Sequence, residues 1–270
     1  MRGDFPGQIP VAFTFDFSIR SLLSGKPSPN LFDLEEKREL LKGQGVKILM
    51  ECPFDEVRTM SPESFIKDIL VDLLHAKTII IGDDFHFGYN REGDAKLLEA
   101  LASVNGYRFV MIDKVKDESG EEIGSTRIRS ELTKGNIEKV NALLGFPYFI
   151  SGQVIHGKHL GEKIGSPTIN QGISADKLLP PYGVYFSKVT VGDREYPAVT
   201  NIGCKPTVSS SNIPGAETYL FDFEGDIYEK EVVTSLYHFE RSERVFENVN
   251  ALSKQIQTDM ANAREYWKIK

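Results

Sequence analysis

Residues 78–88 read Thr-Ile-Ile-Ile-Gly-Asp-Asp-Phe-His-Phe-Gly, and this stretch decides the fold class of the first half of the chain. An apolar run that a glycine ends is typical of a strand covered on both faces of a parallel sheet. Strand-like runs at 11–15, 46–50 and 108–113 alternate with helix-like segments on either side of it. Such alternation predicts an α/β domain in which helices wrap a parallel sheet.

Capping residues indicate where the helices of this half begin. Asp33 is followed by Glu36, which is the spacing of a capping box. Ser61-Pro62-Glu63 combines a cap, a proline at the first helical position and an acid in the first turn. The apolar residues that follow, within 65–74, have helical spacing, and a further helix is expected over 94–104.

The second half has a different periodicity, and the change comes near residues 145–148. Short β-prone runs broken by turn residues follow up to about residue 239, and Gly192-Asp193 marks a hairpin turn. This pattern predicts a small antiparallel barrel or sandwich. An apolar stripe from Val249 to Trp267 predicts a closing helix that packs on it. We therefore expect two domains, residues 1–148 and 149–270.

Composition narrows the class of protein. The chain has 270 residues and a formal net charge of -7, which disfavours general nucleic-acid binding but allows a small anionic ligand. No apolar run approaches the roughly 20 residues of a membrane helix, and residues 1–10 lack the layout of a signal peptide. Cys52 and Cys204 are far apart and are expected to be buried, small residues. A cytoplasmic protein without a membrane or nucleic-acid partner fits best; the sequence does not indicate its oligomeric state.

The segment from His156 to Asn170 is the most informative for chemistry. Its glycines let backbone N–H groups approach phosphates closely, whereas Thr168 and Asn170 offer neutral oxygens to Mg²⁺. Residues two apart in a strand face the same side, so both oxygens can reach one ion. A turn-rich barrel strand without a ligand is the competing interpretation. His156 and His159 have a spacing that zinc ligands use, but no third ligand lies nearby.

A second candidate is Glu217. In a strand it would share one face with Tyr219, Phe221 and Phe223. A carboxylate among aromatic rings can be tuned for proton transfer, although a solvated carboxylate at a sheet edge explains the pattern equally well.

The first half holds two more candidates. Asp84 and Phe85 lie in the loop after the apolar strand, where ligands of open α/β sheets bind. In Ser125-Thr-Arg-Ile-Arg129, a hydroxyl is expected to cap the next helix, and Arg127 and Arg129 could bind phosphate. The alternative is a capped surface helix with solvated arginines.

Taken in order along the chain, these segments resemble the bacterial bifunctional riboflavin kinase/FAD synthetase family. The resemblance covers nearly the whole chain from Val11 onward. The motifs that carry it are Gly165-Ser-Pro-Thr-Ile-Asn170, Gly183-Val-Tyr185, Asn201-Ile-Gly-Cys-Lys-Pro-Thr207, Glu217-Thr-Tyr-Leu-Phe-Asp-Phe-Glu-Gly-Asp-Ile-Tyr228, Gly82–Gly88 and Ser125–Arg129. It implies a Rossmann-like nucleotidyltransferase domain followed by an antiparallel riboflavin kinase barrel with a C-terminal helix.

The resemblance also implies roles for single residues in the kinase. Thr168 and Asn170 would bind the Mg²⁺ of Mg-ATP, and Glu217 would be the general base for riboflavin's terminal ribityl hydroxyl. Arg241 would lie in the loop on the flavin side. The phosphates of ATP would be covered by the loop that contains Gly157, Gly161, Gly165 and Pro167.

For the other domain, the resemblance implies that AMP is transferred to FMN, which makes FAD. Nucleotide binding would fall to Asp84, Phe85, Ser125, Thr126, Arg127 and Arg129.

One departure from the family concerns this second activity. Family members begin with a strand and a His-x-Gly-His motif, but no histidine precedes His75 here. Three explanations stay open: a sequence that starts late in a bifunctional protein, a variant that kept only the kinase, or a non-catalytic flavin- or nucleotide-binding regulator. We expect an active kinase, an impaired FMN adenylyltransferase, and a sheet edge or gap where the strand is missing.

Overall fold

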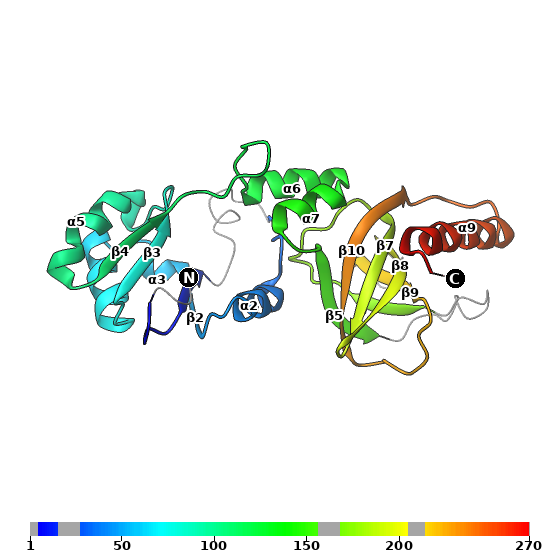
Figure 1. Ribbon diagram of the computed structural model, residues 1–270, viewed down its shortest axis with the longest axis horizontal. Helices are drawn as coiled ribbons and strands as arrows, with labels where there is room; N and C mark the ends of the chain where they lie inside the picture. Colours follow the sequence, from blue (N-terminus) through cyan, green and yellow to red (C-terminus); the bar gives the residue numbers. More distant parts are fainter. Residues whose placement is uncertain (1–4, 16–27, 156–167, 205–213, 270) are drawn as a thin grey trace. The chain divides into compact units, whose positions relative to one another are not determined.

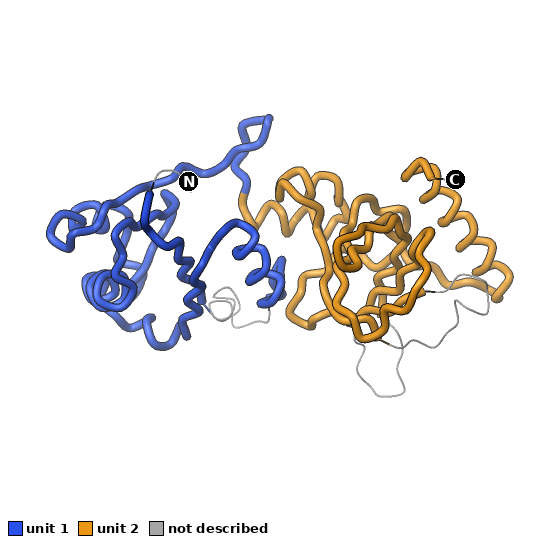
Figure 2. Tube along the Cα trace, turned by 60° about the horizontal axis from the view of Figure 1, so that its bottom comes forward, with its two compact units in different colours: residues 1–123 blue, residues 124–270 orange. Residues whose placement is uncertain are grey.

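The computed structural model of the chain describes residues 5–15, 28–155, 168–204 and 214–269 (Figure 1). The chain divides into two compact units, residues 1–123 and residues 124–270, which Figure 2 colours separately. Within the described ranges, no helix combines the length and the apolar character that crossing a membrane requires.

Unit 1 alternates strands and helices, as the sequence predicts. Its strands are β1 (Val11–Phe15), β2 (Ile48–Cys52), β3 (Thr78–Gly82) and β4 (Arg108–Ile112). Its helical elements are α2 (Leu34–Gly43), α3 (Phe54–Val57), α4 (Pro62–Ser64), the π-helix η1 (Phe65–Leu73), the 3-10 helix η2 (Tyr89–Arg91) and α5 (Ala95–Asn105). The strand predicted at 46–50 therefore lies two residues further along.

The capping signals of unit 1 are confirmed. The Asp33 carboxylate accepts a hydrogen bond from the Glu36 N–H (3.0 Å), and the Glu36 carboxylate accepts one from the Asp33 N–H (3.1 Å). Ser61 caps α4, with Pro62 in the first turn. The helix after this cap differs from the expectation, because it continues as the π-helix η1.

The parallel pairing predicted for unit 1 is present, but it is divided between two sheets. β1 pairs with β2 and β3 pairs with β4, and no ladder joins the two pairs among the described residues. Both pairs contribute to one apolar core, in which Cys52 of β2 and Ile79 of β3 are buried. The prediction that both faces of β3 are covered is wrong, since Ile80 is 37% exposed.

Unit 2 begins with two helices, α6 (Ser125–Lys134) and α7 (Ile137–Leu144), and ends with a third, α9 (Val249–Trp267). Between them lie β5 (Phe149–Ile155), β6 (Ile169–Gly172), β7 (Gly183–Val191), β8 (Arg194–Cys204), β9 (Pro214–Leu220) and β10 (Glu231–Ser242). The strands form a closed antiparallel barrel in the order β10-β5-β6-β9-β8-β7. The hairpin at Gly192 is confirmed, and of the two predicted architectures the barrel is the correct one.

A chain of hydroxyl groups runs through the barrel interior. Thr200 on β8 lies 2.9 Å from Thr218 on β9 and 2.7 Å from Ser187 on β7, oxygen to oxygen, and all three residues are fully buried. Gln171 on β6 accepts a bond from Thr234 on β10 (2.9 Å). Because a buried hydroxyl without a partner is costly, these bonds favour one pairing register over its alternatives.

Helices cover the outer surface of the barrel. Ala263 of α9 packs with Phe186 and Phe221, and Figure 1 shows α9 running beside the barrel. Asn141 of α7 bonds that helix to the barrel: its amide donates to the Leu236 carbonyl of β10 (2.8 Å) and accepts from the Tyr148 N–H (2.7 Å).

The two helices before the barrel belong to unit 2. The domain boundary predicted at residue 148 falls inside that unit, between α7 and β5, and as a boundary between functional domains it stays a prediction.

Neither cysteine is in a disulfide, and only one of the two is buried as expected. Cys52 is buried in the core of unit 1. Cys204, the last residue of β8, is only partly buried. Its thiol donates to the Tyr182 hydroxyl (3.1 Å).

Replacing Gly183 by alanine tests the fit between β7 and β10. At Gly183 φ is +156°, and an added Cβ would lie 2.1 Å from the Arg241 carbonyl oxygen. We expect Gly183→Ala to lower the free energy of unfolding by about 1–3 kcal/mol, because backbone has to move. Gly172→Ala is the matched control, since nothing lies within 4 Å of its Cβ position. Urea unfolding followed by the fluorescence of Trp267, the only tryptophan, measures both; equal stabilities would contradict the prediction.

Replacing Glu131 by glutamine tests the turn between α6 and α7. A hydrogen bond from Asn136 (2.6 Å), together with Lys134 and Lys139, lowers the pKa of Glu131 to about 2. A lowered carboxyl pKa stabilises the fold above the unfolded-state pKa of about 4.3, and this contribution is lost as the pH falls toward 2.

We therefore expect the wild type to lose more unfolding free energy between pH 5 and pH 3 than Glu131→Gln does. Glu265→Gln, on the exposed side of α9, is the control and should behave as the wild type. Parallel pH profiles for the wild type and Glu131→Gln would refute the assignment.

Candidate functional site

Glu217 lies on the outer face of the barrel, between two amides. In the strand register it is paired with Asn170 on β6 and with Asn201 on β8. Its neighbours in β9, Ala216 and Thr218, are buried in the interior, so alternation directs Glu217 outward. Directly paired residues on one sheet face are close enough for their side chains to meet. The register therefore places a carboxylate between two neutral amides.

Thr168 adds a hydroxyl to this group. Its Oγ1 lies 2.8 Å from Oε1 of Glu217. An ionised carboxylate only accepts, so Thr168 is the donor and keeps its lone pairs for another partner. Thr168 precedes β6 by one residue and is two positions from Asn170, which places both on the same face. Both residues thus lie next to Glu217, Thr168 by its hydrogen bond and Asn170 by the strand register, and the prediction that both bind one ion stays a prediction.

The donor set at this face suits a hard cation. Thr168 and Asn170 supply neutral oxygens, and Mg²⁺ commonly takes few protein ligands and completes its shell with water and phosphate oxygens. No group of three or more His, Cys, Asp and Glu residues that could hold a metal occurs in the described ranges.

The aromatic residues predicted to share a face with Glu217 do so only in part. Tyr219 and Phe221 are in edge-to-face contact, with centroids 5.2 Å apart, and both belong to the cluster beneath α9. The strand ends at Leu220, so Phe223 turns away and packs on Tyr196 instead (5.1 Å). The prediction that Phe223 shares a face with Glu217 is wrong, because the turn after β9 interrupts the alternation of side chains along the strand.

Arg241 is at the far end of the same row of residues. It is paired with Val184 on β7, which in turn is paired with Asn201. Its guanidinium group contacts Asp259 of α9 through Nε (2.9 Å to Oδ1) and Nη2 (2.6 Å to Oδ2). The sequence analysis missed Asp259. A carboxylate inside an apolar helix stripe was the available signal, because a buried charge needs a partner.

Several predicted residues lie outside the described part of the chain. They are Gly157, Gly161, Gly165 and Pro167 of the glycine-bearing loop, together with His156 and His159.

The candidates of the first half are found in two different units. Asp84 and Phe85 follow β3 in unit 1, where the Asp84 carboxylate lies 3.4 Å from the Lys114 ammonium and Phe85 stacks on Phe87. The Lys114 ammonium donates hydrogen bonds to Glu122 and to Asp84. Both bonds raise the pKa of Lys114, and the bond to Glu122 has the larger effect. Asp84 is thus an exposed residue with a cationic neighbour.

The motif Ser125-Thr-Arg-Ile-Arg129 opens α6 in unit 2. The expected side-chain cap is absent: Gly124 is the N-cap, and the helix begins at Ser125 itself. Ser125 and Thr126 are exposed, whereas Arg127 and Arg129 are partly buried. The first turn therefore presents two hydroxyls to solvent.

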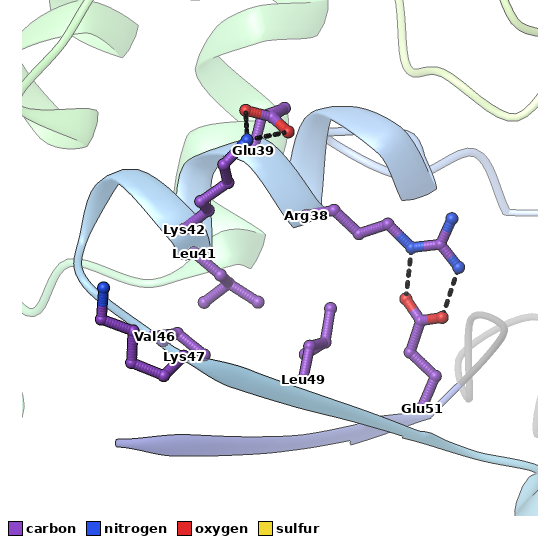
Figure 3. Close-up of a pocket in the computed structure, with 8 residues that line it drawn as sticks. All are labelled: Arg38, Glu39, Leu41, Lys42, Val46, Lys47, Leu49 and Glu51. Atoms are coloured by element: carbon purple, nitrogen blue, oxygen red, sulfur yellow. Dashed lines mark hydrogen bonds and ion pairs between the residues drawn. The ribbon is translucent and has the colours of Figure 1, made fainter. Parts of the chain in front are cut away.

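A shallow pocket between α2 and β2 holds none of the predicted residues (Figure 3). Two of its charges are paired with each other, since Arg38 binds Glu51 through Nε (3.0 Å) and Nη2. The hydrogen bond from Arg38 lowers the pKa of Glu51. The lining residues are Arg38, Glu39, Leu41, Lys42, Val46, Lys47, Leu49 and Glu51.

Two family matches cover most of the chain. Residues 144–267 match the riboflavin kinase family, and residues 6–127 match the FAD synthetase family.

Relatives of known function match across both regions. A bifunctional riboflavin kinase/FMN adenylyltransferase of Buchnera aphidicola is 34% identical over 97% of this chain and 85% of its own length. Its counterpart in Bacillus subtilis is 35% identical over 90% of this chain and 77% of its own length. A solved structure named macrolide-efflux protein, from Streptococcus pneumoniae, has a TM-score of 0.81 at 28% identity, covering 94% of this chain and 83% of that one.

Proposed function

Because this chain belongs to the bifunctional riboflavin kinase/FMN adenylyltransferase family, we propose that its barrel transfers the γ-phosphoryl group of ATP to riboflavin and releases FMN. One observation carries the proposal: Glu217 is paired in register with Asn170 and bonded to Thr168. A base and two neutral metal ligands on one face are what such a transfer needs, since catalysis there is mainly positioning and charge neutralisation.

In the proposed reaction, Glu217 takes the proton of riboflavin's terminal ribityl hydroxyl. The oxygen forms a bond to the γ-phosphorus, the bond from that phosphorus to the β,γ-bridging oxygen breaks, and ADP leaves. Thr168 holds one carboxylate oxygen of Glu217 in place.

The residues at this face fit Mg²⁺, and Thr168 and Asn170 would hold it. When bound, Mg²⁺ would neutralise charge on the phosphates of ATP. The loop that contains Gly157, Gly161, Gly165 and Pro167 is proposed to cover those phosphates, and Arg241 is proposed to bind the flavin.

The first part of the chain belongs to the FAD synthetase type. We assign its nucleotide binding to Asp84, Phe85, Ser125, Thr126, Arg127 and Arg129. We propose that this activity is weak in the chain as given, for two reasons. No histidine precedes His75, and among the described residues of unit 1 no ladder joins the β1–β2 pair to the β3–β4 pair.

Replacing Glu217 by glutamine tests the proposed base. We expect Glu217→Gln to lower kcat for FMN formation by about 10²–10⁴-fold, because general-base catalysis contributes that much. The substitution keeps the size of the side chain, so the unfolding transition should stay where it is. Glu195→Gln on neighbouring β8 is the control, since its carboxylate is exposed and paired with Lys188 (3.1 Å). Undiminished turnover by Glu217→Gln would exclude the role.

Comparing the two activities tests the second proposal. Given FMN, ATP and Mg²⁺, the chain should form FAD at least about 100-fold more slowly than it forms FMN from riboflavin, since losing groups that stabilise reacting charge costs factors of this size. Flavins separated by chromatography give both rates. Comparable rates would mean that the His-x-Gly-His motif is dispensable here.

A further inference from the structure

Asp259 is a buried carboxylate for which the proposed reaction has no step. It lies on α9 and is only 3% exposed. Besides both contacts from Arg241, its Oδ1 accepts a hydrogen bond from the Gln255 amide (2.9 Å). A buried ion pair is by itself weak evidence of a stabilising role, because apolar residues of similar size commonly stabilise a fold as well. The geometry of the Arg241–Asp259 pair therefore points to a role besides stability.

The backbone of β10 is shaped to direct Arg241 outward. The register of β10 against β7 shifts between Phe239 and Arg241. Without this bulge, Arg241 would follow the alternation of Phe239, which is paired with the fully buried Tyr185. With it, Arg241 is opposite Val184 on the outer face, in the row of Glu217. Bulges commonly re-aim a side chain next to an active site.

The position of Arg241 in that row suits a ligand longer than the reacting group. Three strand spacings separate Glu217 on β9 from Arg241 on β10, by way of β8 and β7. At about 4.8 Å per spacing this is about 14 Å along the barrel surface. A polyol chain that ends at Glu217 and carries a ring at its other end would bring the ring toward Arg241.

The hydrogen bonds of Arg241 indicate the chemistry of that ring. Nε and Nη2 bind Asp259, and Nη1 donates to the Ser242 carbonyl (3.1 Å). Within the described chain this leaves two N–H groups of the guanidinium group. Because Asp259 compensates the positive charge, these donors suit a neutral acceptor such as a ring carbonyl better than a phosphate.

We propose that Asp259 is a positioning residue of the kinase site, which holds the Arg241 guanidinium group so that its remaining N–H groups bind the carbonyl edge of the flavin ring. α9 then contributes to flavin binding, because it supplies the carboxylate that orients Arg241. This inference rests on the proposed function and adds to it the residue that orients Arg241.

Steady-state kinetics with Asp259→Asn test the inference. We expect KM for riboflavin to rise about tenfold or more, because the fork that orients the guanidinium group is lost, while KM for ATP stays within twofold. Asn262→Ala is the matched control. It removes another α9–β10 contact, from the Asn262 amide to Glu240 (2.8 Å), and should leave both constants unchanged. Asp259→Glu should restore part of the affinity, and it replaces Asp259→Asn as the test variant if the latter does not fold.

Arg241→Ala separates the possible failures. It should raise KM for riboflavin as well, and adding Asp259→Asn to it should change nothing more, since Asp259 acts through Arg241. An unchanged KM for riboflavin in Asp259→Asn would overturn the inference, as would an effect of equal size in Asn262→Ala. An unchanged KM in Arg241→Ala would overturn it too and leave the kinase proposal standing. A wild type that forms no FMN would overturn both.

Discussion

The alternation of β9 decides which face of the barrel carries Glu217, and buried hydroxyls hold that alternation in place. Thr218, the next residue, bonds to Thr200 inside the barrel. A slip of one residue would turn Thr218 outward and bring the Glu217 carboxylate into a closed interior, where a lone charge is costly. The same register sets Asn170 and Asn201 on either side of Glu217. A site on the outer face thus depends on hydrogen bonds inside the barrel.

Local signals in the sequence were sufficient for most of the fold. The caps at Asp33 and Ser61 and the hairpin at Gly192 depend on a few neighbouring residues, and all three are confirmed. What could not be predicted depends on distant parts of the chain. The exposure of Ile80 and the π-helical course of η1 are two such features, since no neighbouring residue in the sequence indicates either of them.

The two ends of the candidate site differ in the same way. Thr168 and Asn170 could be predicted to share a face, because residues two apart in a strand do so. Their position next to Glu217 depends on the pairing of β6 with β9, which the spacing does not indicate. The partner of Arg241 could not be predicted. The direction of the Arg241 side chain is set by a bulge in β10, and the sequence does not mark where a bulge changes the alternation. Asp259, which binds Arg241, lies on α9, and only the closed barrel brings that helix near.

The central claim is that the outer face of β6, β9 and β8 is where phosphoryl transfer to riboflavin takes place. A crystal structure of the chain with riboflavin, Mg²⁺ and a non-hydrolysable ATP analogue tests it most directly. The account predicts that the metal ion is bound by the oxygens of Thr168 and Asn170, and that the terminal ribityl hydroxyl lies within hydrogen-bond distance of Glu217. Riboflavin bound elsewhere, with its ribityl chain away from Glu217, would contradict it.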